Sequence, residues 1–103
     1  MNIIDLFSGA GGLTFGFYYD LVNGQFIRAN NRFVFANEYE PRAAKAFSEN
    51  FPNIHMENCD IRDLTEDKIR KLINLSQIPD GEEVDLIIGG PPCQSFSTVG
   101  QRI

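Results

Sequence analysis

The first quarter of the chain joins a short apolar segment to a glycine-rich turn and then to an apolar repeat of helical period. The segment Asn2–Leu6 leads directly into Ser8–Gly12, where three of the five residues are glycine. Apolar side chains then recur every four residues over Leu13–Leu21, which predicts a helix that ends near Val22, before the helix-breaking pair Asn23-Gly24. A strand, a glycine turn and a helix in this order open a βαβ unit, so the sequence predicts an α/β fold with a parallel sheet.

The rest of the sequence repeats this alternation of strands and helices. Three more segments have the composition of strands: Arg32–Glu38, Ile54–Glu57 and Val84–Ile88. Two helices are predicted between them, one over Pro41–Asn50 with proline in its first turn and one that begins after an N-cap at Thr65. Residues 23–31 are expected to form a polar connection with a short extended piece at Phe26-Ile27. Because the carboxyl ends of parallel strands meet at one edge of a sheet, the loops that follow the four strands should converge there.

The length and the charge of the chain limit what it can do. With 103 residues, it is expected to form at most one small domain over residues 1–103. The formal net charge is −5 and the nine basic residues are scattered, which argues against this segment carrying the main nucleic-acid surface. Two cysteines and no secretory leader indicate a reducing, cytoplasmic setting. No apolar run approaches the roughly 20 residues that a membrane span requires.

Three features at the predicted edge could bind a ligand, and each also has a purely structural interpretation. The glycines of Ser8–Gly12 would let a ligand approach the backbone, although a tight strand-to-helix turn needs them equally, and the dinucleotide pattern G-x-G-x-x-G fails at Thr14. Glu38 ends the second strand, where a carboxylate can accept from both ribose hydroxyls or can simply be solvated. Asp60 could accept from the exocyclic amine of adenine or could form an ordinary turn.

Cys93 is the candidate nucleophile. It follows the last predicted strand in a loop where Pro91 and Pro92 fix two φ angles, an arrangement that suits a side chain that must be aimed. No Lys, Arg or His adjoins it in sequence to favour its thiolate form, so the sequence provides its position but not its activation. Cys59 is expected to be a buried structural thiol, and with His55 as the single histidine no metal site is predicted.

Four motifs together resemble the cytosine-5 DNA methyltransferase family. They occur in the family's order and spacing across essentially the whole chain: Asp5-Leu6-Phe7-Ser8-Gly9-Ala10-Gly11-Gly12, Ala36-Asn37-Glu38, Asp60-Ile61 and Gly90-Pro91-Pro92-Cys93-Gln94-Ser95-Phe96-Ser97. The glycine loop is moderately specific, whereas the Pro-Cys-Gln-x-Phe-Ser loop behind an apolar strand is highly specific. The resemblance implies the N-terminal portion of a Rossmann-like, S-adenosylmethionine-dependent methyltransferase fold, with about four parallel strands and intervening helices.

The resemblance also implies a role for each matching residue. Cys93 would be the catalytic nucleophile, and a loop that closes over DNA would contain Gln94, Ser95, Phe96 and Ser97. The other matches would bind S-adenosylmethionine: Phe7 against the adenine, Ser8, Gly9, Ala10, Gly11 and Gly12 around the amino-acid end, Glu38 on the ribose, Tyr39 along the cofactor, Asp60 and Ile61 at the adenine, and Pro92 at the border of the site. The implied reaction is methyl transfer to carbon 5 of cytosine in double-stranded DNA, with the target base flipped out of the stack.

The family pattern extends beyond what this sequence contains. The Glu-Asn-Val strand, the arginine motif beyond it, the target recognition domain and the C-terminal helix are missing, and with them most of the family's DNA-binding surface. The strand Val84–Ile88 would then lie at an exposed sheet edge, which predicts an excerpt of a longer protein, or half of a split enzyme that needs a second polypeptide and is inactive alone. Three alternatives remain: a cofactor- or partner-binding fragment without catalysis, a dinucleotide-dependent oxidoreductase, which the failed glycine pattern disfavours, and an RNA cytosine methyltransferase.

Overall fold

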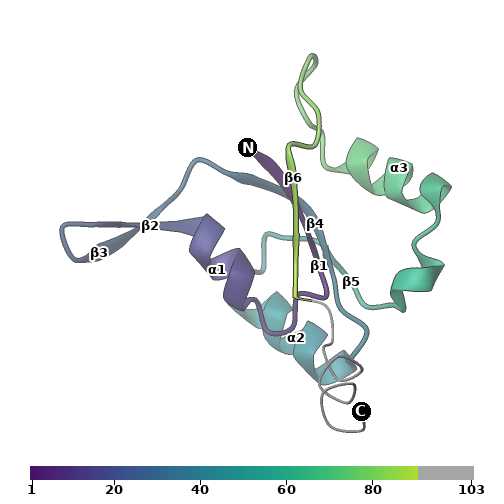
Figure 1. Ribbon diagram of the computed structural model, residues 1–103, viewed down its shortest axis with the longest axis horizontal. Helices are drawn as coiled ribbons and strands as arrows, with labels where there is room; N and C mark the ends of the chain where they lie inside the picture. The colour runs from purple at the N-terminus through teal and green to yellow at the C-terminus, as the bar shows by residue number, and fades with distance from the viewer. Residues whose placement is uncertain (91–103) are drawn as a thin grey trace, which may run out of the picture.

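A four-stranded parallel sheet forms the centre of the computed structural model, which describes residues 1–90 (Figure 1). In space the strands follow the order β5 (Met56–Glu57), β4 (Arg32–Asn37), β1 (Asn2–Leu6) and β6 (Leu86–Gly89), and every neighbouring pair is parallel. Counted along the chain this is the order 3-2-1-4, as in a doubly wound nucleotide-binding sheet. The predicted α/β class with about four parallel strands is therefore confirmed.

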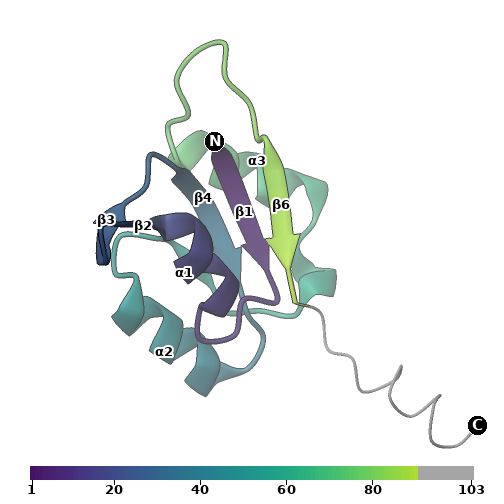
Figure 2. The same ribbon diagram turned by 60° about the vertical axis from the view of Figure 1, so that its left-hand side comes forward.

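Helices cover both faces of this sheet (Figure 2). Helices α1 (Gly12–Tyr18) and α2 (Pro41–Asn50) lie on one face, and α3 (Glu66–Leu75) lies on the other. Side chains alternate along β1, so Ile3 joins the core under α1 and α2 while Ile4 joins the core under α3. The chain builds outward from β1 on one side and then crosses to the other side of β1, so the topological switch point lies between β1 and β6.

The two longer helices begin where the sequence predicts. Pro41 occupies the first turn of α2, and the carboxylate of Glu40 accepts a hydrogen bond from the backbone N–H of Ala43 at 2.7 Å. Thr65 caps α3, because its hydroxyl accepts from the backbone N–H of Lys68 at 3.2 Å. Each cap satisfies a backbone donor that the first helical turn would otherwise leave without a partner.

The segment after α1 departs most from the sequence prediction. The helix predicted to reach Val22 ends at Tyr18, and β2 (Tyr19–Val22) forms an antiparallel hairpin with β3 (Gln25–Arg28). The Asn23-Gly24 pair has positive φ at both residues, 51° and 76°, as a two-residue type I′ hairpin turn requires. The predicted helix terminator is thus a hairpin turn, and the short extended piece within the predicted polar connection is confirmed as part of β3.

Aromatic packing explains why a hairpin forms here instead of a longer helix. Phe15 of α1 packs against Tyr19 and Phe26, with ring centroids 5.0 and 5.2 Å apart. Leu21, which would continue the buried stripe of a longer helix, is 66% exposed in the hairpin. The buried side chain of α1 is instead that of Thr14. The contact between Phe15 and Phe26, which lie eleven positions apart in the sequence, therefore overrides the four-residue repeat.

Three strands differ from their predicted bounds. β4 ends at Asn37, so Glu38 directly follows the strand instead of ending it. β5 is limited to Met56 and Glu57, because the preceding Ile54 turns into the core and is 7% exposed. β6 begins at Leu86 rather than at Val84 and continues to Gly89. Among residues 1–90 it forms the edge of the sheet that the sequence predicts, and its Ile87 is 61% exposed. Within the same residues, no helix is both long and apolar enough to cross a membrane.

Candidate functional site

A cavity of about 380 Å³ lies at the carboxyl ends of the strands, beside the switch point between β1 and β6. It is lined by residues that follow four different strands: Phe7, Glu38, Tyr39, Glu40, Asp60, Ile61 and Gly90. Five of these residues belong to the predicted cofactor set, and they come from three motifs that are far apart in the sequence. The predicted convergence of the strand-end loops is therefore what the structure shows.

The predicted nucleophile is not among the described residues. Cys93, Pro92 and the loop Gln94–Ser97 all lie outside residues 1–90. Gly90, the last described residue, lines the cavity and precedes Cys93 by three positions in the sequence. The described part of the chain thus contains the predicted cofactor residues up to the beginning of the nucleophile motif.

The loop after β1 is held in an unusual backbone conformation. Phe7 has a φ of 54°, in the left-handed region that non-glycine residues rarely adopt. Gly9 has a φ of 58°, and its backbone N–H donates to Oε1 of Glu38 at 2.8 Å. The backbone N–H of Ser8 donates to the carbonyl oxygen of Asn37 at 3.0 Å. These bonds tie the loop after β1 to the end of β4, so the strained conformation is fixed by its neighbours.

The carboxylate of Glu38 joins the glycine loop to the beginning of α2. Its Oε1 accepts from the Gly9 N–H, and its Oε2 accepts from the Glu40 N–H at 2.9 Å. A carboxylate has about four acceptor positions, so with respect to residues 1–90 two remain for a ligand. The predicted ribose-binding residue is therefore already oriented, with one free position on each oxygen.

One residue of the glycine loop is buried, and others border a second cavity. Ser8 is buried, while Ala10, Gly11 and Gly12 border a neighbouring cavity of about 410 Å³ together with Phe15, Tyr19, Asn50 and Phe51. Gly11 has a φ of 105°, and a Cβ added there would lie 2.5 Å from Cε2 of Phe51. This glycine is required both by its conformation and by the close approach of Phe51.

Asp60 is held in place by Arg62. The backbone N–H and Nε of Arg62 donate to Oδ1 of Asp60 at 2.9 and 3.0 Å, and Nη2 donates to Oδ2 at 2.6 Å. These bonds to the Arg62 side chain and backbone lower the pKa of Asp60 to about 2. Asp60 caps the short 3-10 turn Ile61–Asp63, so a single conformation forms both the cap and the wall of the cavity.

Asp5 of β1 is a buried acid near the site, and the sequence indicated no role for it. It is 0% exposed, and its Oδ2 accepts from the hydroxyl of Thr14, which is also 0% exposed. Burial raises the pKa of Asp5 to about 6; the Thr14 bond opposes this shift, and the nearby charge of Glu38 adds to it. Among residues 1–90, the other Asp5 oxygen, Oδ1, and the hydroxyl of Ser8 are buried without a hydrogen-bond partner. The signal in the sequence was an acid inside an apolar strand with Thr14 where the dinucleotide pattern has glycine.

Cys59, which was predicted to be a buried structural thiol, is less buried than expected. Cys59 is half-buried, and its sulfur accepts from Nδ2 of Asn37 at 3.6 Å. Burial is the largest influence on this thiol and raises its pKa, so Cys59 stays a neutral thiol at neutral pH. The same Asn37 amide donates to the carbonyl oxygens of Glu57 and Cys59 at 3.0 and 2.9 Å. These bonds hold the loop that leads to Asp60 against the end of β4.

The cavity at the strand ends has the chemistry of a nucleoside site. Phe7 and Ile61 provide apolar walls, which suit the faces of a purine ring. Glu38 and Asp60 provide carboxylates with free acceptor positions, which suit a ribose diol and an exocyclic amine. Tyr39 is 68% exposed at its rim. The residues present therefore fit the adenosine part of S-adenosylmethionine.

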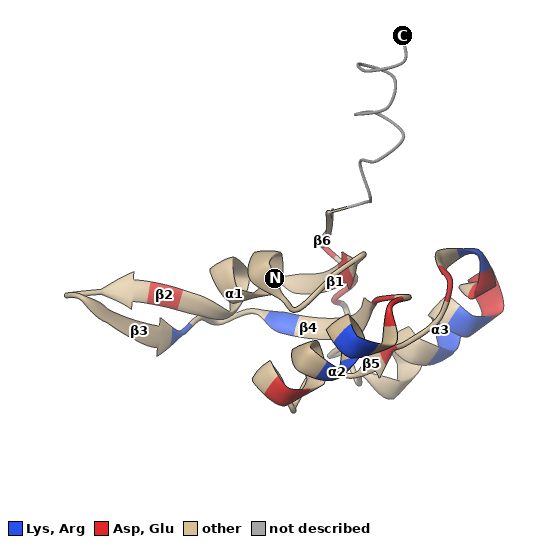
Figure 3. Cartoon of the chain, turned by 90° about the horizontal axis from the view of Figure 1, so that it is seen from below, with Lys and Arg blue, Asp and Glu red and all other residues tan. Residues whose placement is uncertain are grey.

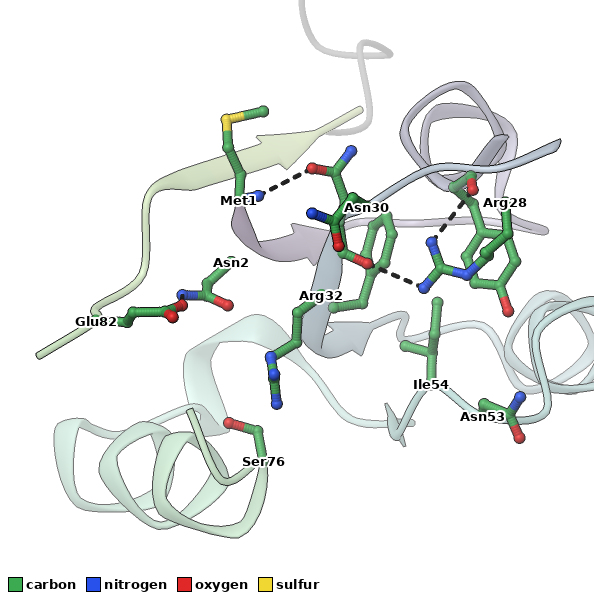
Figure 4. Close-up of a pocket in the computed structure, with 12 residues that line it drawn as sticks. Met1, Asn2, Arg28, Asn30, Arg32, Asn53, Ile54, Ser76 and Glu82 are labelled. Carbon is green, nitrogen blue, oxygen red and sulfur yellow. Dashed lines mark hydrogen bonds between the residues drawn. The ribbon is translucent and has the colours of Figure 1, made fainter. Parts of the chain in front are cut away.

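A larger cavity lies at the amino ends of the strands (Figure 4), and none of its described lining residues is a predicted site residue. Its volume is about 560 Å³, and its lining includes the amino ends of β1 and β4. Arg28 provides one of its cationic groups, but the guanidinium of Arg28 donates to the carbonyl oxygens of Tyr18, Ala29 and Asn31 at 3.2, 2.6 and 2.9 Å. It also stacks on the Tyr18 ring at 3.7 Å. Arg28 therefore anchors the base of the β2–β3 hairpin.

Charged residues in the described part of the chain do not gather into one basic surface (Figure 3). On α3, Arg70 pairs with Glu66 one turn away. Lys68 pairs with Glu57 at 3.4 Å, and that same carboxylate contacts His55 at 2.9 Å. Arg42 and Arg62 are likewise paired with the neighbouring acids Glu40 and Asp60.

Comparison with known proteins gives one family. The chain matches the family model for C-5 cytosine-specific DNA methylase over residues 1–103. It is 39% identical over 102 residues to the type II methyltransferase M.AgeI of Thalassovita gelatinovora, covering 99% of this chain and 21% of that protein. It is 39% identical to M.NgoPII of Neisseria gonorrhoeae, covering 97% of this chain and 24% of that protein.

A solved structure agrees with these sequence matches. The chain superposes with a TM-score of 0.69 and 33% identity on a crystal structure assigned as a prophage-encoded DNA modification methyltransferase (E. coli), covering 93% of this chain and 24% of that one. The chain therefore spans about a fifth to a quarter of the length of these relatives. Sequence and structure together place the chain in the C-5 cytosine-specific DNA methylase family.

Proposed function

We propose that this chain provides the S-adenosylmethionine site and the nucleophile of an enzyme that methylates carbon 5 of cytosine in DNA. One observation carries the proposal most strongly. Phe7, Glu38, Asp60 and Ile61 line a single cavity, and Gly90, which leads to Cys93 in the sequence, lines the same cavity. The resemblance assigns these residues to one cofactor, and their convergence supports that assignment.

In the proposed arrangement, each described residue binds or orients. Phe7 and Ile61 hold the two faces of the adenine, Asp60 accepts from its amine, and Glu38 accepts from the ribose hydroxyls. Ser8 and the loop up to Gly12 surround the amino-acid end, where the positive φ of two glycines brings the backbone close. The bound cofactor supplies an electrophilic methyl group.

Cys93 makes the target base reactive. Its thiolate adds to ring carbon 6 of a flipped-out cytosine, a sulfur–carbon bond forms, and the electron pair moves so that carbon 5 becomes nucleophilic. The activated carbon 5 would then take the methyl group that a bound S-adenosylmethionine would supply, and the electron pair of the broken methyl–sulfur bond would stay on sulfur. Loss of the carbon-5 proton to a base expels the thiolate and restores the ring. The rest of the catalytic domain, on the same or a second polypeptide, provides the base and most DNA contacts.

A covalent trap tests this assignment. Tritiated S-adenosylmethionine and DNA that contains 5-fluorocytosine are incubated with the chain, alone and together with the polypeptide that supplies the remaining motifs. Fluorine at carbon 5 blocks the final elimination, so a protein–DNA adduct that carries tritium should accumulate in the complete system. Cys93→Ser should abolish the adduct, whereas Cys59→Ser, the matched control, should leave it unchanged. An adduct that survives Cys93→Ser would exclude Cys93 as the nucleophile.

A further inference from the structure

Arg62 fixes the carboxylate of Asp60, which lines the cavity, but Arg62 does not line the cavity itself. Among the described residues, the lining includes Asp60 and Ile61 but not Arg62. The side chain of Arg62 is 87% exposed, whereas that of Asp60 is 23% exposed. Three N–H groups of Arg62 donate to the two oxygens of Asp60, at 2.9, 3.0 and 2.6 Å. Three donors on one carboxylate fix both its position and the plane in which it lies.

We propose that Arg62 is a positioning residue that makes the site prefer a 6-aminopurine over a 6-oxopurine, acting through Asp60. The proposal rests on the proposed function, which places the adenine beside Asp60. A carboxylate has about four acceptor positions. Arg62 occupies both positions on Oδ1 and one on Oδ2, so within the described part of the chain one acceptor position on Oδ2 stays open. The exocyclic amine of adenine donates to that position.

The preference follows from the donor and acceptor character of the two purines. An amino group at position 6 donates to Oδ2, whereas an oxo group at the same position is an acceptor and leaves two acceptors facing each other. A freely rotating Asp60 could turn its carboxylate away from the oxo group toward solvent. Because Arg62 prevents that rotation, the mismatch with a 6-oxopurine persists and the site discriminates against it.

The ionisation of Asp60 is consistent with this role. Its hydrogen bonds to Arg62 lower the pKa of Asp60 to about 2, so the carboxylate only accepts at any pH in the physiological range. An unpaired aspartate is also ionised at pH 7. Near neutrality the contribution of Arg62 is therefore the orientation of Asp60 rather than its charge.

An exposed ion pair with no role in recognition would behave differently. Such pairs contribute little to stability, and removing one should change the affinities for two closely related ligands equally. The ratio of the two affinities therefore separates a positioning role from a general structural one. Arg70 provides the matched control, because it is also an exposed arginine paired with an acid, Glu66, but it lies on α3 and does not line the cavity.

The test measures the affinities of two ligands for four forms of the full 103-residue chain. S-adenosylhomocysteine and S-inosylhomocysteine differ at position 6 of the purine, amino in the first and oxo in the second. Isothermal titration calorimetry gives both dissociation constants for the parent chain, Arg62→Ala, Arg62→Lys and Arg70→Ala. The parent should bind the adenosyl ligand about tenfold more tightly, as expected for one hydrogen bond to a charged group.

The expected result is a change in the ratio. Arg62→Ala should reduce the tenfold preference to about twofold, and Arg62→Lys should restore it only in part, because an ammonium cannot provide the planar fork of a guanidinium. Arg70→Ala should keep the parent ratio. A parent-like ratio in Arg62→Ala, while S-adenosylhomocysteine still binds, would overturn this inference alone. Failure of the parent chain to bind S-adenosylhomocysteine at all would overturn the proposed function and this inference with it.

Discussion

The loops at the carboxyl ends of the strands and the hairpin at their amino ends are held by different kinds of interaction. At the carboxyl edge, the loops are fixed by short backbone and carboxylate bonds, such as those from Gly9 and Glu40 to Glu38. At the amino edge, the β2–β3 hairpin is held by stacked rings and by the Arg28 guanidinium on backbone carbonyls. The hydrogen bonds at the carboxyl ends involve residues of the sequence motifs. The contacts of the hairpin depend on which side chains the tertiary fold brings together. The carboxyl edge was therefore predictable from the sequence, and the hairpin was not.

The largest expected effect tests the rigidity of the carboxyl edge. Gly11→Ala would place a Cβ 2.5 Å from the ring of Phe51 at a φ of 105°. We expect a loss of about 4 kcal/mol in the free energy of unfolding, from backbone strain and overpacking together. Gly12→Ala is the matched control, because its Cβ would meet nothing within 4 Å and it starts α1. Urea denaturation followed by circular dichroism measures both, and equal stability of the two variants would show that Gly11 is not constrained.

The second effect tests the buried Asp5–Thr14 pair. Burial raises the pKa of Asp5 from 3.8 to about 6, so the folded chain binds this proton more tightly than the unfolded chain. Its contribution to stability is therefore fully present below pH 3.8 and is lost as the pH rises through about 6, by up to about 3 kcal/mol. Asp5→Asn cannot titrate and should lack this component. Denaturation at a series of pH values between 4 and 7 measures the difference between parent and variant, and parallel pH profiles would contradict a raised pKa.

The third effect tests whether the hairpin is independent of the site. The backbone N–H of Ala29 donates to the carbonyl oxygen of Tyr18 at 2.8 Å, so the two ends of the hairpin are already adjacent. Replacing residues 19–28 with Gly-Gly would join them as a four-residue turn. We expect a loss of about 2 kcal/mol from the missing aromatic contacts, but less than a twofold change in the affinity for S-adenosylhomocysteine. A tenfold loss of affinity would show that the hairpin contributes to ligand binding at the carboxyl ends of the strands.

The smallest effect separates the hairpin from the predicted helix. Leu21 is 66% exposed in the hairpin, whereas a helix continued to Val22 would bury it. Leu21→Ser should therefore change the free energy of unfolding by less than about 0.5 kcal/mol. Thermal melting at fixed concentration measures this, with the half-buried Phe17 changed to serine for comparison. A loss above about 2 kcal/mol for Leu21→Ser would favour the longer helix.

Most of the architecture and most of the site follow from local rules. The apolar strand, the glycine turn and the acid at the end of β4 each require a particular backbone conformation, so they were readable from the sequence. The stacking of Phe15 on Phe26 depends on distant partners, and no periodicity indicates it. The Asp5–Thr14 bond escaped prediction for the same reason, because burial on both sides becomes evident only once the sheet and α1 are assembled.

The central claim is that the cofactor binds at the carboxyl edge, among the loops after β1, β4 and β5. Titrating the full ¹⁵N-labelled chain with S-adenosylhomocysteine, and following its amide resonances, tests this most directly. We expect saturable shifts for the amides of Phe7, Gly9, Tyr39 and Ile61, with those of the hairpin unchanged. Largest shifts instead at Asn30, Arg32 and Asn53, which line the opposite cavity, would contradict it.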